Sequence, residues 1–297
     1  MNIGIDIGGS HVGVGIVEDD GTIVKFEETY INSSCEKNMA NYMQSVIINI
    51  LERWSKDGNV QIQKIGIGVP GEIENGDTIT CFNLGIKDYN FKEEIQKKFP
   101  NCQIRLKNDA KCAGLAEKNI GSIKDFDNAI FMCLGTGIGS AVFKNGVLIE
   151  SENHVGHITL IENGEQCNCG KRGCFERYAS MRHFKGEIRK SLNLPNNVEG
   201  DDLLNIVKSN FSNLIVENTV NKYIHDLCSG LSIIINKYEP EAICIGGGFV
   251  KYSELLLNKI IDGLKDEKYN NKINYIPKIV VAKFGNDAGI VGSALFI

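Results

Sequence analysis

One histidine and three cysteines between positions 157 and 174 give the strongest local chemical signal in the sequence. His157 offers an imidazole, and Cys167, Cys169 and Cys174 offer thiolates. One imidazole and three thiolates make a complete tetrahedral ligand set for zinc. The glycines at positions 170 and 173 provide turns that would let the loop wrap around an ion. Because protein fills all four positions, the expected zinc is structural and has no place for an activated water. The alternative is a chance cluster of free thiols.

The other cysteines do not indicate a disulfide scaffold. The chain has 297 residues and ten cysteines, and it begins without a signal-like segment. Cys112, Cys133, Cys228 and Cys244 lie in apolar segments, which is typical of buried thiols. In a reducing compartment a tight cysteine cluster more often binds metal. We therefore expect a cytoplasmic protein in which only the clustered cysteines need a special explanation.

The bulk composition limits the class of partner. Hydrophobic residues make up 42% of the chain, charged residues make up 23%, and the formal net charge is −5. Proteins that bind nucleic acid usually carry a basic field, so nucleic acid is disfavoured as the main partner. No apolar run approaches the roughly 20 residues needed to span a bilayer. These features favour a globular protein that has neither nucleic acid nor a membrane as its partner.

Three glycine-rich turns follow β-type segments, in "GGSHVG", "GTGIGS" and "IGGG". Each one alone is most simply a tight turn, and neither of the first two fits a Walker-type phosphate loop. Successive backbone N–H groups in such turns can also form an anion-binding concavity. Two hydroxyl-bearing turns and a third glycine turn together favour a nucleotide, with its phosphates between two domains and its base near the third turn.

Two aspartates stand beside these turns. Asp6 precedes the first glycine turn, and Asp109 lies in "LKNDAK" ahead of an apolar helical pattern. The simplest interpretation is that Asp6 is a solvated carboxylate at a strand end and that Asp109 is a helix N-cap. The functional alternatives are a general base for an alcohol nucleophile and a carboxylate associated with Mg²⁺. Phosphoryl transfer needs groups of both kinds.

The elements that would position these residues alternate between β and α. Apolar residues at 39, 42, 43, 46, 47, 50, 51 and 54 predict an amphipathic helix, and residues 218–238 show a second helical stripe. Strands are expected in "IQKIGIGVPG" and "EAICIGGGFV". The segment "IRLKNDAKCAGLAEKNIG" reads as a strand, a polar turn and a helix that ends near Gly121.

An internal repeat links two of the glycine turns. The segments "IGIDIGGSHVGVGIVEDDGTIV" and "AIFMCLGTGIGSAVFKNGVLI" share the layout strand, glycine turn, strand, hairpin turn, strand. A duplicated α/β unit would place the two glycine turns across a cleft from one another. We expect an N-terminal α/β domain over residues 1–118 and a larger domain with the zinc loop over residues 119–285. A C-terminal helix in residues 286–297 should pack back on the first domain.

Several motifs together resemble the ROK group of repressors, uncharacterised reading frames and sugar kinases, over nearly the whole chain. "IDIGGSHVGVGIV" and "LGTGIGS" resemble its phosphate motifs, "VPGEIENGDTITCFNLG" its sugar-contact segment and "NDA" its catalytic turn. "GHI" followed by "CNCGKRGCFERYAS" resembles its specific zinc-and-sugar signature, and "IGGG" and "NDAGIVGSAL" resemble its later segments. The resemblance implies a duplicated actin-like, ribonuclease-H-like ATPase fold with two domains around a central cleft.

The resemblance also implies roles for single residues in an ATP-dependent sugar kinase that uses Mg²⁺ and structural Zn²⁺ and forms a homodimer. Asp109 would be the general base for the sugar 6-hydroxyl, Asn108 would hold a neighbouring hydroxyl, and Glu176 would accept from hydroxyls near the anomeric end. The implied substrate-binding residues are Gly71, Asn83, Asn108, Asp109, His154, His157 and Glu176. The implied nucleotide-binding residues are Asp6, Gly8, Gly9, Ser10, His11, Gly135, Thr136, Gly137, Gly247 and Gly248.

Three positions depart from the commonest family pattern. His11 replaces a frequent lysine, which puts a cationic phosphate contact in doubt, and Phe82 replaces a usual proline. His154 replaces a frequent glutamate and gives the string "HVGH", which resembles bacterial N-acetylmannosamine kinases. The expected product is therefore N-acetylmannosamine 6-phosphate, made in sialic acid catabolism. The alternatives are a glucokinase, a kinase for allose or N-acetylglucosamine, a sugar-sensing regulator of the same fold and a zinc module that acts in protein interaction.

Overall fold

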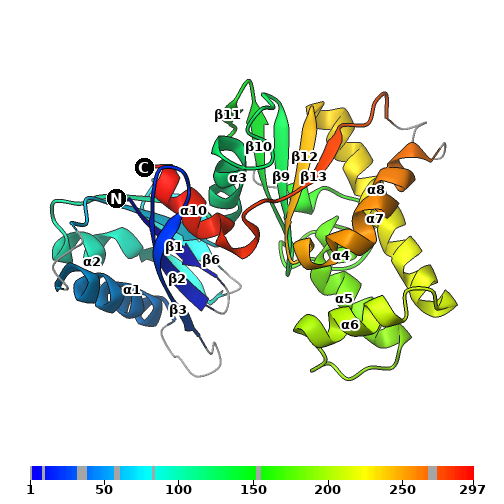
Figure 1. The fold of residues 1–297 in the computed structure, drawn as a ribbon, viewed down its shortest axis with the longest axis horizontal. Helices are drawn as coiled ribbons and strands as arrows, with labels where there is room; N and C mark the ends of the chain where they lie inside the picture. Colours follow the sequence, from blue (N-terminus) through cyan, green and yellow to red (C-terminus); the bar gives the residue numbers. More distant parts are fainter. Residues whose placement is uncertain are drawn as a thin grey trace. The chain divides into compact units, whose positions relative to one another are not determined.

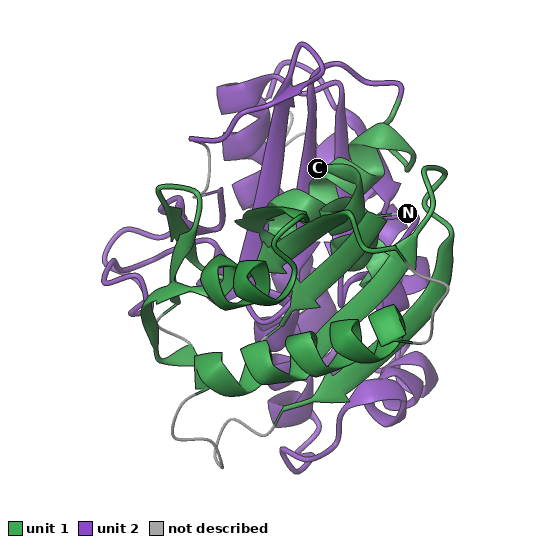
Figure 2. Cartoon of the chain, turned by 90° about the vertical axis from the view of Figure 1, so that its left-hand side faces the viewer, with its two compact units in different colours: residues 1–124, 286–297 green, residues 125–285 purple. Residues whose placement is uncertain are grey.

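The structure is a computed structural model that describes residues 2–8, 11–31, 39–56, 61–81, 84–151, 155–266 and 273–297. The chain divides into two compact units, coloured separately in Figure 2. Unit 1 comprises residues 1–124 and 286–297, and unit 2 comprises residues 125–285. Within the described residues, no helix has both the length and the apolar content that crossing a membrane requires.

Unit 1 is built on a five-stranded sheet with the order β3-β2-β1-β4-β8 (Figure 1). The central strand β1 pairs antiparallel with β2 and parallel with β4, and β4 pairs parallel with β8. A smaller sheet with the order β5-β6-β7 follows β4 in the chain. The strands are β1 (Asn2–Ile7), β2 (His11–Val17), β3 (Ile23–Tyr30), β4 (Lys64–Val69), β5 (Glu72–Glu74), β6 (Thr78–Cys81), β7 (Ile86–Asn90) and β8 (Gln103–Asn108).

Helices cover this sheet, and the apolar stripe predicted from Met39 onward is confirmed as helix α1. Its buried residues include Met43, Ile47 and Trp54, which belong to the hydrophobic core of unit 1. The helices of unit 1 are α1 (Met39–Lys56), α2 (Phe91–Lys98), α3 (Asp109–Asn119) and α10 (Ala288–Leu295), with a short 3-10 turn η4 (Gly285–Asp287) before α10.

Helix α10 lies directly on the sheet of unit 1 although it follows all of unit 2 in the chain (Figure 1). It packs against β1, β4 and α3. A side chain at Gly66 on β4 would place its Cβ 1.7 Å from the carbonyl oxygen of Ser293, so only glycine permits this backbone approach. The glycines of β1 and β4 therefore bring α10 close to the strand ends that carry the candidate site.

Unit 2 repeats the same sheet. Its strand order is β11-β10-β9-β12-β13, with β9 antiparallel to β10 and parallel to β12, and β12 parallel to β13. The predicted internal repeat is confirmed, because both sheets share strand order and strand direction. The strands are β9 (Ala129–Leu134), β10 (Ile138–Lys144), β11 (Val147–Leu148), β12 (Ala242–Gly247) and β13 (Lys278–Val281). The predicted hairpin turn is also confirmed, since Asn145 and Gly146 both have positive φ.

The helices of unit 2 surround a second hydrophobic core. The predicted helix over residues 218–238 is confirmed as α7, but α7 begins four residues earlier because the Asn213 side chain caps it by accepting from Ile215 N. The helical elements are η2 (Val155–His157), α4 (Glu176–Ala179), α5 (Met181–Ser191), α6 (Gly200–Ser209), α7 (Leu214–Tyr238), η3 (Val250–Tyr252) and α8 (Ser253–Lys265).

The cysteines follow the predicted burial with one correction. Cys112, Cys228 and Cys244 are fully buried, as expected. Cys133 is only half-buried, because its partners in register on both neighbouring strands, Gly139 and Gly246, have no side chains to cover it. Within the described residues, no disulfide joins any of the nine cysteines.

Candidate active site and metal centre

In unit 1, the candidate catalytic residues stand at the carboxyl ends of neighbouring parallel strands. Asp6 lies near the end of β1 in register with Gly68 of β4, and Gly68 is in register with Lys107 of β8. Asn108 ends β8, and Asp109 is the first residue of α3. Ligands of open α/β sheets bind beyond this edge of the strands. The topology of unit 1 therefore brings Asp6, Asn108 and Asp109 to one edge of its sheet.

Asn108, and not Asp109, is the N-cap of α3. The Asn108 side-chain oxygen accepts hydrogen bonds from Ala110 N at 3.1 Å and from Lys111 N at 3.3 Å, and its Nδ2 donates to Gly71 O at 3.2 Å. The capping interpretation of Asp109 is therefore wrong, because the residue before it already satisfies the helix end. The same bonds join Asn108 to Gly71, two residues that the sequence placed in the sugar site.

The Asp109 carboxyl is held in an environment that suits a base. Burial, and then repulsion from the Asp6 carboxylate, raises its pKa from the ordinary 3.8 to about 7, against a hydrogen bond that its Oδ1 accepts from Ala110 N at 2.7 Å. General-base efficiency is highest when the pKa lies near the operating pH. Asp109 is thus able to accept a proton near neutral pH.

Asp6 forms an ion pair with His11 across the first glycine turn. The His11 Nε2 atom lies 3.8 Å from Asp6 Oδ2, and the imidazole ring folds over Gly8. The nearby Asp6 carboxylate raises the pKa of His11, although partial burial of the ring opposes this. The first turn therefore places an imidazole, whose pKa is raised by Asp6, at the position where the family has a frequent lysine.

In unit 2, the second and third glycine turns lie side by side. Gly247 at the end of β12 is in register with Leu134 at the end of β9, and Gly135 follows directly. Gly135 N donates to Gly137 O at 3.0 Å and closes the second turn, in which Thr136 is exposed. Gly248 continues the third turn beside Leu134. The predicted nucleotide-binding residues of unit 2 thus meet at one edge of its sheet.

The four predicted metal ligands also come together in unit 2. Their ligand atoms all lie within 4.8 Å of one another, with 3.6 Å between Cys169 Sγ and Cys174 Sγ and 3.6 Å between Cys167 Sγ and His157 Nδ1. A tetrahedral zinc site with Zn–S bonds near 2.3 Å has S···S edges of about 3.8 Å, so the cluster has the right size for such an ion. The two glycines in this loop, at positions 170 and 173, have positive φ as the predicted turns require.

Glu176 lies between the metal cluster and the second glycine turn. It is the first residue of α4, two positions after Cys174. Its Oε1 accepts from Cys167 Sγ at 3.2 Å and lies 3.7 Å from His157 Nδ1, while its Oε2 accepts from Ile138 N at 3.3 Å. The sequence marked Glu176 as a sugar contact but gave no sign of the bond to Ile138, because that bond joins segments 38 residues apart.

Four predicted site residues cannot be placed. Gly9, Ser10, Asn83 and His154 lie outside the described residues, as does Phe82. Their assignments stay predictions.

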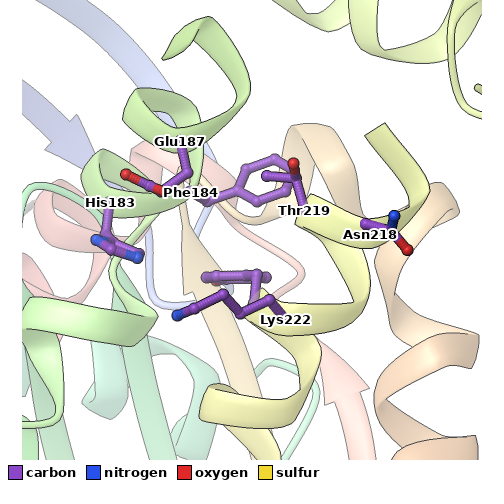
Figure 3. A pocket seen from close by; sticks show the side chains of 7 residues that line it. His183, Phe184, Glu187, Asn218, Thr219 and Lys222 are labelled. Atoms are coloured by element: carbon purple, nitrogen blue, oxygen red, sulfur yellow. The ribbon is translucent and has the colours of Figure 1, made fainter. Parts of the chain in front are cut away.

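A cavity in unit 2 is lined by other residues than these clusters (Figure 3). Its volume is about 240 Å³, and helices α5 and α7 contribute all of its lining. The lining residues are His183, Phe184, Glu187, Asn218, Thr219, Lys222 and Tyr223. None of the predicted site residues within the described ranges belongs to it, so this cavity does not revise the candidate site.

Residues 2–297 match the ROK family, and the chain belongs to it. Among its relatives, a glucokinase of Thermotoga maritima is 28% identical over 316 residues, covering 99% of this chain and 96% of the relative. A xylose repressor of Bacillus subtilis is 26% identical over 302 residues, covering 100% of this chain and 76% of the repressor. The family therefore contains both enzymes and regulators with similar levels of sequence identity to this chain.

Solved structures confirm the predicted duplicated, actin-like fold class. A Streptomyces griseus glucokinase in complex with glucose and AMPPNP has a TM-score of 0.83 at 22% identity, covering 99% of this chain and 97% of that one. A Listeria monocytogenes protein, named provisionally as an N-acetylmannosamine kinase, has a TM-score of 0.80 at 22% identity with the same coverage. At this level of identity the likeness concerns the fold alone.

Proposed function

We propose that the protein is an ATP-dependent sugar kinase in which Asp109 is the general base. The observation that carries the proposal is the Asp109 carboxyl, which is released from helix capping by Asn108 and has its pKa raised to about 7 by burial and Asp6. A structural N-cap has no need of such a pKa, whereas a base that activates an alcohol does. The kinase relatives within the ROK family support the same activity.

In the proposed reaction, Asp109 takes the proton of the sugar 6-hydroxyl as the oxygen attacks the terminal phosphorus of ATP. The bond between that phosphorus and the β–γ bridging oxygen breaks, and ADP leaves. Asn108 is held by α3 and by Gly71, so it can orient a neighbouring hydroxyl from a fixed position. The backbone N–H groups of the glycine turns are suited to hold phosphate oxygens, and His11 adds a positive charge when it is protonated. Mg²⁺ would offset phosphate charge, and Asp6 is the carboxylate in unit 1 best suited to associate with it.

We propose zinc as the metal of the His157, Cys167, Cys169 and Cys174 cluster. Three sulfur ligands and one nitrogen ligand at tetrahedral spacing fit zinc, and a filled set of ligands assigns it a structural role. Its effect on the reaction would be positional, since it would hold the loop that carries His157 and Glu176. Small misplacements of a bound substrate can cost about 100-fold in rate.

We propose N-acetylmannosamine as the sugar. The support is the "HVGH" string, together with the chemistry of an imidazole at position 154. A neutral imidazole offers one donor and one acceptor, so it can donate to an acetamido carbonyl, whereas an ionised glutamate can only accept. Glucose is the principal alternative, in view of the glucokinase relative, and allose and N-acetylglucosamine follow it.

A panel of hexoses in a coupled ADP-release assay tests both levels of the proposal. We expect N-acetylmannosamine to have the highest kcat/KM and His154→Glu to shift the ratio of kcat/KM values toward glucose. Equal or better wild-type kcat/KM on glucose or allose would contradict the assignment of N-acetylmannosamine as the substrate but would leave the kinase assignment unchanged. The xylose repressor favours a second candidate, a sugar-sensing regulator. Sugar binding without ADP release on any member of the panel would support that candidate.

A further inference from the structure

The metal cluster and the second glycine turn of unit 2 share one carboxylate. Glu176 directs Oε1 to Cys167 Sγ and His157 Nδ1, and it directs Oε2 to the backbone N–H of Ile138. Its side chain is only 18% exposed, so water competes weakly for either oxygen. One side of the carboxylate thus contacts two metal ligands, and the other contacts the residue that directly follows the turn Gly135–Gly137.

The turn itself is shaped to admit this carboxylate. Gly137 does not have a positive φ, so its backbone conformation alone would accept a side chain. A Cβ at Gly137 would nevertheless lie 2.4 Å from Glu176 Oε2. The space that Gly137 leaves is therefore occupied by the Glu176 carboxylate. This explains a glycine that the backbone conformation does not explain.

A second contact holds the metal-ligand segment against the same residue. Gly156, directly before His157, packs so closely on Ile138 that a Cβ there would lie 2.3 Å from Ile138 O. Ile138 thus contacts the metal-binding segment through its carbonyl, on the Gly156 side, and through its N–H, on the Glu176 side. Of the two contacts, only the Glu176 bond reaches the metal ligands through a polar side chain.

We propose that Glu176 is a positioning residue that couples occupancy of the metal centre to the conformation of the second glycine turn. Metal fixes Cys174 and with it the start of α4, where Glu176 stands two residues later, and the carboxylate then orients Ile138 N and the turn before it. Coupling of this kind is reciprocal, so metal would tighten nucleotide binding and nucleotide would tighten metal binding by the same factor. The nucleotide part of this inference rests on the proposed kinase function, but the structural part does not.

The first measurement is hydrogen exchange of residues 135–138 in zinc-loaded protein and in the same protein after chelation. The second is the Kd of AMP-PNP in both states. In wild type, chelation should speed exchange in the turn and weaken AMP-PNP binding by roughly 10-fold, within the usual range of coupling. In Glu176→Ala, chelation should still loosen residues 157–174, but exchange at 135–138 and the Kd should no longer depend on zinc.

Two further variants sharpen the comparison. Glu176→Gln keeps an oxygen that can accept from Ile138 N, so it should retain part of the zinc dependence. Glu165→Gln is the matched control, because Glu165 is a carboxylate of the same loop whose ion pair, within the described residues, is with Arg177 and not with the turn. It should respond to chelation as wild type does. A Glu176→Ala protein whose turn keeps the wild-type zinc dependence would overturn the proposal, and the Gly156 contact would then carry the coupling.

Gly137→Ala keeps the test decisive if Glu176→Ala fails to fold or to hold zinc. It leaves every metal ligand in place and displaces only the carboxylate, so it should bind one zinc and lose the zinc dependence at 135–138. Full zinc dependence in Gly137→Ala would contradict the proposal. If wild type binds no AMP-PNP at all, the kinase function fails, while the exchange measurement still decides the role of Glu176.

Discussion

The first and second glycine turns occupy equivalent places in the two units but obtain their charged groups in different ways. Asp6 on β1 is in register with Gly13 and Gly68, and Cys133 on β9 is likewise in register with Gly139 and Gly246. In unit 1 the strand itself carries the carboxylate, and His11 of the same turn pairs with it. In unit 2 the strand carries a cysteine at this place.

The carboxylate of the second turn comes instead from Glu176, beyond the metal loop. The first turn is also one residue longer, with residues 8–11 between the paired Ile7 and Val12 and residues 135–137 between Leu134 and Ile138. The comparison shows that a duplicated scaffold preserves strand order and register, whereas the length of the turn and the source of its charge can diverge. Unit 1 should therefore respond to local electrostatic changes, and unit 2 should respond to loss of its metal.

The largest effect is expected at the base of unit 1. Asp109→Asn should lower kcat by about 10²–10⁴, because the proton acceptor is lost. The fold should persist, since Asn108 remains the helix cap. Turnover in the ADP-release assay and sugar affinity by calorimetry check this, with little change expected in affinity. Near-normal turnover in the purified variant would show that Asp109 is not the base.

A metal-ligand substitution should produce the next largest effect and should act through unit 2. Wild type is expected to contain about one zinc per chain, as a single closed four-ligand site implies. Cys169→Ser should lower that content and raise the sugar KM, because the loop with His157 and Glu176 loses its anchor. Elemental analysis of protein prepared without chelators measures the zinc. Its absence from wild type would remove the structural-zinc proposal but leave the role of Asp109 untouched.

Asp6 and Cys133 offer a matched pair of substitutions at equivalent positions. Activity should rise with pH through about 7, because Asp109 acts in its ionised form and its pKa lies there. Asp6→Asn removes the repulsion that helps to raise this pKa. The rising limb of the pH profile of kcat/KM should therefore move to lower pH, even if the variant keeps only part of the wild-type activity. Cys133→Ser should leave the limb in place. A limb that does not move in Asp6→Asn would mean that Asp6 does not tune the base.

The smallest expected effect is on stability and its pH dependence. The pKa of Asp109 is raised on folding, so its favourable contribution is complete below about pH 4 and is lost as the pH rises through about 7. Asp109→Asn avoids this loss and should melt higher than wild type at pH 8 but not at pH 4. A difference of about 2–4 °C per kcal/mol is the expected scale for a domain of this size. Equal melting temperatures at pH 8 would argue against a buried, destabilised carboxylate.

Local spacing made much of the site predictable. The metal ligands fall within one short loop, and the glycine turns follow apolar strands, so both could be read from neighbouring residues. The triplet "NDA" shows where such reading ends, because it occurs at residues 108–110 and again at residues 286–288. Asp109 is half-buried near Asp6, whereas Asp287 is exposed. The two aspartates have the same neighbours in the sequence but differ in solvent exposure. Their exposure depends on the surrounding sheet, which no local sequence pattern specifies.

The bond from Glu176 to Ile138 was unpredictable for a related reason. It joins two segments through a backbone N–H, which has no signature in the sequence. The Asn108 cap was missed because both residues of the pair Asn108–Asp109 have side chains that can cap a helix, and only the geometry of the turn distinguishes them. Strand register, the choice of capping residue and a carboxylate shared between two segments all depend on tertiary contacts, so local sequence patterns do not predict them.

The placement of α10 also determines the order in which the protein can mature during synthesis. A ribosome completes residues 125–285 before it makes residues 288–295, so unit 2 has all of its own elements while unit 1 still lacks a helix. Until then, the glycine-lined face of β1 and β4 lacks the cover that α10 provides, and transiently exposed sheet surface of this kind promotes aggregation. Unit 1, although first in the chain, is thus the last to be finished.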